Sequence, residues 1–105
     1  MTAANLSVDE QSNADGVVLG LTGELDIATV PELRSAVSRL LGDGARRLVL
    51  DFSRVTFCDS QGLSALISLN KETVAAGGQL VLVNLGEFMT RLLDITGLRA
   101  AFVIE

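Results

Sequence analysis

The chain has 105 residues, 49% of them hydrophobic, and its 13 acidic and 8 basic side chains give a formal charge of −5. This length fits one domain, since domains cluster at roughly 100–150 residues, and the hydrophobic content argues against disorder. The negative charge argues against direct binding to nucleic acid or to an anionic membrane, and no apolar run approaches the roughly 20 residues of a membrane-spanning helix.

The residues that are missing also limit the chemistry. The sequence has no histidine, and its one lysine, Lys71, does not follow a glycine-rich loop, which excludes histidine-dependent triads and a P-loop. We therefore expect a binding protein, not an enzyme, with no cofactor and no metal. The polar N-terminus lacks a signal sequence and the single Cys58 cannot form an internal disulfide, so we expect a cytoplasmic protein.

Two strands joined by a turn are predicted first. Weak alternation of apolar residues indicates an edge strand at residues 6–10, and a β-rich segment indicates a second strand at residues 17–25. The intervening residues 11–16 (QSNADG) are typical turn formers. An antiparallel hairpin is therefore expected.

A helix and a buried strand are predicted next. Thr29 and Glu32 have the spacing of a capping box, with Pro31 in the first turn. An apolar stripe at helical spacing follows, ended by two glycines: Val30, Leu33, Val37, Leu40 and Leu41, then Gly42 and Gly44. The nearly continuous apolar run at residues 48–52 predicts a strand covered on both faces, with Asp51 serving a turn at residues 53–54.

The second half repeats this alternation. A helix is predicted at residues 60–76, a strand at 80–83, a helix at 88–95 stopped by Gly97, and a strand at 101–104. The apolar faces expected for the two helices are Leu63, Leu66, Ile67 and Val74 in one and Phe88, Leu92 and Ile95 in the other. The order β-β-α-β-α-β-α-β predicts one α/β domain, residues 1–105, with a mixed sheet and right-handed crossovers.

The segment at residues 55–63 (VTFCDSQGL) carries the most chemical information. It places Asp59 and Ser60 at a helix N-terminus, where four amides lack partners and the helix dipole is positive. A simple N-cap accounts for either residue without any function. The alternative hypothesis is that Ser60 is phosphorylated, because a group carrying about −1.5 to −2 charges is tolerated at a helix N-terminus and changes the surface that a partner meets.

The same segment resembles the Asp-Ser-Ser-Gly-Leu signature of bacterial anti-sigma factor antagonists, which are STAS domains. Residues 23–26 with Pro31, residues 48–53 with Val55, and residues 92–98 with Phe102 also resemble this family, in order and spacing. The sequence departs from the family in two ways. Gln61 replaces the second serine, and we expect the C-terminal helix of the family to be absent. This would leave one flank of the sheet less covered and open to weak self-association or to a differently shaped partner surface, and a shortened chain explains the absence equally well.

The resemblance implies a partner-switching function. In this family the unphosphorylated antagonist binds an anti-sigma factor with serine kinase activity and so releases a sigma factor. The kinase phosphorylates the serine after the aspartate, here Ser60, and a serine phosphatase reverses the step. The implied partner-binding residues are Asp26, Asp59, Ser60, Gln61, Gly62 and Ser64.

These residues also allow other interpretations. Asp26 should lie at the same end of the sheet as Ser60 and serves equally well as a turn residue. Gly62 is expected to let a partner backbone approach, and Cys58 to be a small buried hydrophobe. The chain could instead be a STAS subunit of a stress-sensing assembly, a transporter or a lipid-transport complex. A small flavodoxin-like enzyme is disfavoured, because no phosphate loop or general base is apparent.

Overall fold

A computed structural model describes residues 5–105, which form a five-stranded sheet in the order β1-β2-β3-β4-β5. The strands are β1 (Leu6–Asn13), β2 (Gly16–Leu25), β3 (Arg47–Cys58), β4 (Gln79–Val83) and β5 (Val103–Ile104). The helices are α1 (Val30–Gly42), α2 (Ser60–Ala75) and α3 (Glu87–Thr96), with a short 3-10 turn, η1 (Arg99–Ala101). Only β1 is antiparallel to its neighbour. The predicted mixed α/β fold and its order of elements are confirmed.

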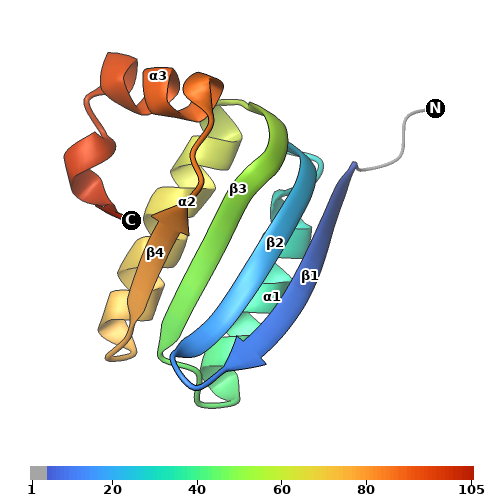
Figure 1. Cartoon of the computed structure of the whole chain (residues 1–105), viewed down its shortest axis with the longest axis vertical. Helices are drawn as coiled ribbons and strands as arrows, with labels where there is room; N and C mark the ends of the chain where they lie inside the picture. Colours follow the sequence, from blue (N-terminus) through green and yellow to red (C-terminus); the bar gives the residue numbers. More distant parts are fainter. Residues whose placement is uncertain (1–4) are drawn as a thin grey trace.

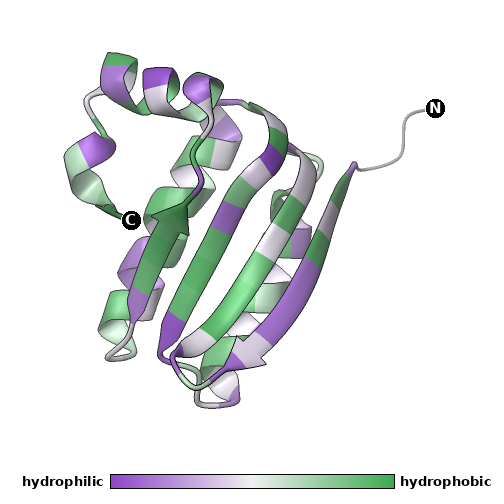
Figure 2. Ribbon diagram, viewed as in Figure 1, coloured by the Kyte–Doolittle hydropathy of each residue, from purple (hydrophilic) through white to green (hydrophobic). Residues whose placement is uncertain are grey.

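The core lies between the sheet and the two longer helices. Helices α1 and α2 cover one face, and α3 lies beyond the end at which β3 and β4 finish, on the β4 side of the sheet (Figure 1). Rows of apolar residues cross the strands on the covered face, for example Leu19, Leu50 and Leu82, all of which are fully buried. The central strands are mostly hydrophobic and the edge strand β1 is mostly hydrophilic (Figure 2). Polar residues on an edge strand discourage pairing with another chain.

The face of the sheet away from α1 and α2 carries a second apolar row. Val49 and Val81 are neighbours there, yet they are only 7% and 0% exposed. The pairing register places the ion pair between Arg47 and Glu105 across this row, because Arg47 precedes the row on β3 and Glu105 follows it after β5. The aliphatic part of Arg47 can therefore shield these valines from water. The predicted weak self-association through an uncovered flank stays a prediction.

The first four strands are longer than the sequence patterns indicated. The hairpin turn is confined to residues 14–15, and pairing of the strands extends from Leu6 opposite Gly23 to Asn13 opposite Gly16. The predicted turn at residues 53–54 is wrong. Strand β3 continues through it to Cys58, because a register shift against β2 absorbs the extra residues as a bulge. The Asp51 carboxylate accepts a hydrogen bond from the Ser53 amide at 2.9 Å and so satisfies a donor of the bulge.

The helix boundaries agree with prediction to within one residue at most ends, but some predicted faces are wrong. Phe88 and Ile95 are 46% and 76% exposed, and α3 instead buries Met89 and Leu93. In α2, Val74 is exposed, while its neighbour Thr73 is buried and donates its hydroxyl to the Leu69 carbonyl. An internal bond of this kind lets a threonine occupy an apolar environment. The last strand is also shorter than expected, since Ala101 belongs to η1.

Thr29 is the N-cap residue of α1, as predicted, but the side-chain hydrogen bonds of a capping box are not formed within residues 5–105. The Thr29 side chain caps no helix amide there, and Thr29 is 1% exposed. Its hydroxyl donates to the Glu24 carbonyl at 2.8 Å and accepts from the Asp26 amide at 2.9 Å. Thr29 therefore ties the loop between β2 and α1 into a fixed shape.

Candidate phosphorylation and partner-binding site

The loop after β2 and the start of α2 lie together at one end of the sheet. The last residues of two parallel strands, Leu25 and Cys58, are paired in register. The Asp59 amide then donates to the Leu25 carbonyl at 3.1 Å. This bond joins the residue before Ser60 to the residue before Asp26. The expectation that these two segments emerge at the same end of the sheet is confirmed.

Asp59 is the N-cap of α2, and Ser60 is the first residue of the helix. The Asp59 backbone is extended, and its carboxylate accepts from the Gly62 amide at 2.8 Å. Ser60 is exposed to solvent. Helix capping therefore accounts for the presence of Asp59, but it does not account for the hydroxyl group of Ser60.

Backbone donors remain available next to this hydroxyl. Asp59 satisfies two amides of the first turn, through its carboxylate to Gly62 and its carbonyl to Leu63. The amides of Ser60 and Gln61 precede these and have no preceding turn to accept their hydrogen bonds. Within residues 5–105 these two amides have no hydrogen-bond acceptor. The free donors and the positive end of the helix dipole favour a negative group on Ser60, while the Asp59 charge opposes it modestly.

Gly62 is required by a contact within the molecule. It is buried, and a Cβ atom built on it would lie 2.4 Å from the Leu25 carbonyl oxygen and 3.0 Å from Cys58 Sγ. Only a residue without a side chain lets the first turn of α2 pack this closely on the ends of β2 and β3. The expected approach of a partner backbone to Gly62 stays a prediction.

Asp26 shapes its own loop. Its carboxylate oxygen Oδ1 accepts from the amides of Ala28 and Thr29, at 3.0 and 3.1 Å. The interpretation of Asp26 as a turn residue is therefore confirmed. Asp26 is half-buried. Its role in partner binding stays a prediction.

Comparison with known proteins identifies the family. A family model described as "STAS domain" matches residues 5–105. The chain belongs to the STAS domain family. It is 36% identical over 95 residues to the anti-sigma-B factor antagonist of Bacillus subtilis (strain 168), covering 90% of this chain and 86% of that protein. The anti-sigma-B factor antagonist of Staphylococcus aureus (strain NCTC 8325 / PS 47) is 28% identical, with coverage of 90% and 88%.

Solved structures show the same likeness in three dimensions. An anti-sigma factor antagonist from Mycobacterium paratuberculosis is 27% identical, with a TM-score of 0.83 and coverage of 98% of this chain and 89% of that chain. The phosphorylated form of SpoIIAA, a Bacillus cell fate determinant, is 26% identical, with a TM-score of 0.71 and coverage of 95% and 90%. The arrangement around Ser60 is therefore part of a STAS fold that is shared over nearly the whole chain.

Exposed apolar side chains occur in segments next to Ser60 in this STAS domain. Ile27, in the loop after β2, is 70% exposed and lines a groove with Gln61 and Ser64. Phe57, three residues before Ser60, forms a tilted aromatic pair with Phe88, with ring centroids 5.9 Å apart, and both are at least 40% exposed. Sequence analysis missed these residues, because it assigned Phe88 to the core and gave Ile27 and Phe57 no role. Large exposed apolar residues close to a candidate site are typical of interfaces.

The Cys58 thiol is expected to be unreactive in the folded protein. Burial and the neighbouring Asp59 charge raise the pKa of this thiol from 9.0 to about 12, so thiolate is scarce near neutral pH. A thiol reagent at pH 8 should react slowly with the native protein and rapidly with protein unfolded in guanidinium chloride. Equal rates in the two states would contradict the burial.

The same shift predicts a pH dependence. Above pH 9 the unfolded chain loses the Cys58 proton while the folded chain retains it up to a pKa of about 12. The folded state then binds more protons, so the free energy of unfolding should fall as pH rises through this range. The Cys58→Ala variant should lack this part of the decline.

Proposed function

We propose that this STAS protein is an anti-sigma factor antagonist that binds its anti-sigma factor when unphosphorylated and is released by phosphorylation of Ser60. The observation that carries the proposal is the exposed Ser60 hydroxyl at the first position of α2, with the capping role filled by Asp59. The names of the relatives support the antagonist role. The description of SpoIIAA in a phosphorylated form supports the switch.

The proposed switch acts on the surface and leaves the fold unchanged. A serine kinase transfers the γ-phosphoryl group of ATP to Ser60 Oγ, the hydroxyl proton is released, and ADP leaves. The phosphate meets the helix N-terminus, so the folded state tolerates it. A partner docked over Ser60 meets a new charge that it must desolvate, and binding weakens. A serine phosphatase resets the switch by hydrolysis.

The binding role agrees with the surface of the protein. In the described part of the chain, no three Asp, Glu or Cys side chains gather into a metal-binding group. No helix of residues 5–105 is both long and apolar enough to cross a bilayer. The site presents hydroxyl, carboxylate and apolar groups on an outer surface, which suits docking of another protein.

Mapping of the phosphate tests this proposal. The purified protein is incubated with ATP and an anti-sigma factor kinase from the same organism, and the added mass is located by peptide mapping. We expect one phosphate, on Ser60. The Ser60→Ala variant should take up none and should stay bound to the kinase, whereas Ser64→Ala should still take up one phosphate, on Ser60. Undiminished phosphorylation of Ser60→Ala would overturn the proposal.

A further inference from the structure

A groove between α1 and α2 lies beside the start of α2. Its volume is about 340 Å³, and it is lined by Ile27, Val30, Pro31, Arg34, Ser35, Gln61 and Ser64. The apolar part of the lining is Ile27, Val30 and Pro31, from the loop before α1 and from its first turn. Helix α2 contributes the polar side chains of Gln61 and Ser64. Gln61 lines the groove and directly follows Ser60 in the chain, and both residues are exposed, so the groove adjoins the surface around Ser60.

Among the described residues, Arg34 is the only charged one that lines this groove. Four other arginines of the described chain, at positions 39, 47, 91 and 99, form ion pairs, and Arg46 donates to backbone carbonyls. Within residues 5–105, the guanidinium of Arg34 has neither an ion pair nor a hydrogen bond, although the residue is half-buried. A partly desolvated cation without a counter-charge favours a negatively charged occupant.

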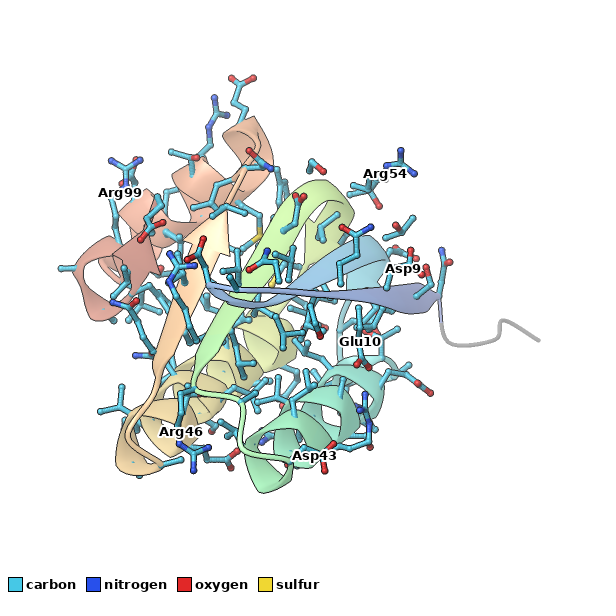
Figure 3. All side chains as sticks on the ribbon, turned by 60° about the horizontal axis from the view of Figure 1, so that its bottom comes forward. Asp9, Glu10, Asp43, Arg46, Arg54 and Arg99 are labelled. Atoms are coloured by element: carbon cyan, nitrogen blue, oxygen red, sulfur yellow. The ribbon has the colours of Figure 1, made fainter. Side chains whose placement is uncertain are left out.

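Arg54 offers a useful comparison, since it is also without an ion pair in the described chain. It lines a different hollow, on the sheet face away from the helices, together with Asp9 and Asp51. Figure 3 shows Arg54 and Asp9 on that side, whereas Glu10 points toward α1, where it pairs with Arg39. Arg54 thus has carboxylates nearby, and Arg34 has none in its groove.

We propose that the groove receives a segment of the anti-sigma factor that presents an apolar side chain next to a carboxylate. The carboxylate pairs with the Arg34 guanidinium, and the apolar side chain packs against Ile27, Val30 and Pro31. This inference rests on the proposed function, because the groove adjoins Ser60 and is covered by the same partner. It adds Arg34 as a residue that determines which partner binds.

Charge complementarity supports an acidic partner segment. The chain as a whole carries a charge of −5, so an acidic segment is repelled from most of its surface. A carboxylate is attracted most where a cation lacks nearby carboxylates, and among the described residues that line this groove Arg34 is that cation. Arg34 therefore fixes the register of the partner on the surface, as single charged pairs commonly do in interfaces.

The test compares charge reversals at the two arginines. Binding of the purified anti-sigma factor to wild type, Arg34→Glu and Arg54→Glu is measured by titration calorimetry. We expect Arg34→Glu to weaken binding by about 10- to 100-fold and Arg54→Glu by less than about threefold. A partner variant with the paired carboxylate changed to lysine should restore binding to Arg34→Glu, as a double-mutant cycle detects.

The outcomes separate the two proposals. If the wild type binds but Arg34→Glu binds equally well, the groove is not the docking site, while the proposed function stands. If the wild type binds no anti-sigma factor, the proposed function is wrong, and this inference is wrong as well because it depends on that function. If Arg34→Glu alters only the sedimentation of the protein alone, the groove is a contact between two copies, which overturns the proposal.

Discussion

The Ser60→Asp variant is expected to bind the anti-sigma factor at least about 100-fold more weakly than the wild type, which corresponds to about 2.8 kcal/mol. Ser60 is exposed beside the Asp59 carboxylate, so a second charge at this point must be desolvated when a partner docks. The fold should persist, because an acidic residue is favourable in the first turn of a helix. We expect the free energy of unfolding to change by less than about 0.5 kcal/mol.

The Ser60→Asn variant is the matched control, since asparagine has the shape of aspartate without its charge. It should bind within a few-fold of the wild type, which separates the effect of charge from that of size. Calorimetry gives the affinities, and far-UV circular dichroism with urea unfolding gives the stabilities. If aspartate and asparagine weaken binding equally, charge is not the switch. If Ser60→Asp unfolds, the modification cannot leave the fold unchanged.

The fold could be predicted from the sequence because the patterns that indicate strands and helices each lie within one short segment. The apolar runs that form β3 and β4 and the stripe on α1 each occupy one continuous segment, bounded by turn residues. The start of α2 was predicted for the same reason, since a cap and a first turn involve adjacent residues. Local patterns therefore predicted both the architecture and the position of Ser60.

The predictions were wrong where the sequence of a segment is compatible with two different local structures. Helix α3 has apolar residues on more than one side, and periodicity alone could not choose the buried pair, Met89 and Leu93. Asp51 and Ser53 form the hydrogen bond of a turn, yet here that bond stabilises a bulge inside β3. Packing against the rest of the domain determines both the buried face of α3 and the conformation at Asp51 and Ser53. Such contacts cannot be predicted from a short stretch of sequence.

Features formed by residues that are distant in the sequence could not be predicted either. The groove around Arg34 exists only because α1 and α2 lie side by side, and the missing counter-charge of Arg34 is a property of the assembled surface. The reason for Gly62 is likewise a long-range contact. The sequence predicted its presence in the site but assigned its small size to the needs of a partner.

Replacement of Gly62 by alanine tests which explanation is right. The added methyl group would lie 2.4 Å from the Leu25 carbonyl oxygen, a backbone atom held in the sheet. Relief of this clash must move the first turn of α2 and strain the bond from the Asp59 amide to the Leu25 carbonyl. We expect the free energy of unfolding to fall by about 2–3 kcal/mol, and Tm by roughly 10–20 °C.

Gly42 provides the matched control, because it is the last residue of α1 and a Cβ atom there would meet nothing within 4 Å. Gly42→Ala should leave stability unchanged or raise it by up to about 1 kcal/mol, since alanine favours the helix more than glycine does. Thermal and urea unfolding of both variants measure the difference. If Gly62→Ala keeps wild-type stability and loses only affinity for the anti-sigma factor, the glycine serves the partner, and the intramolecular explanation is wrong.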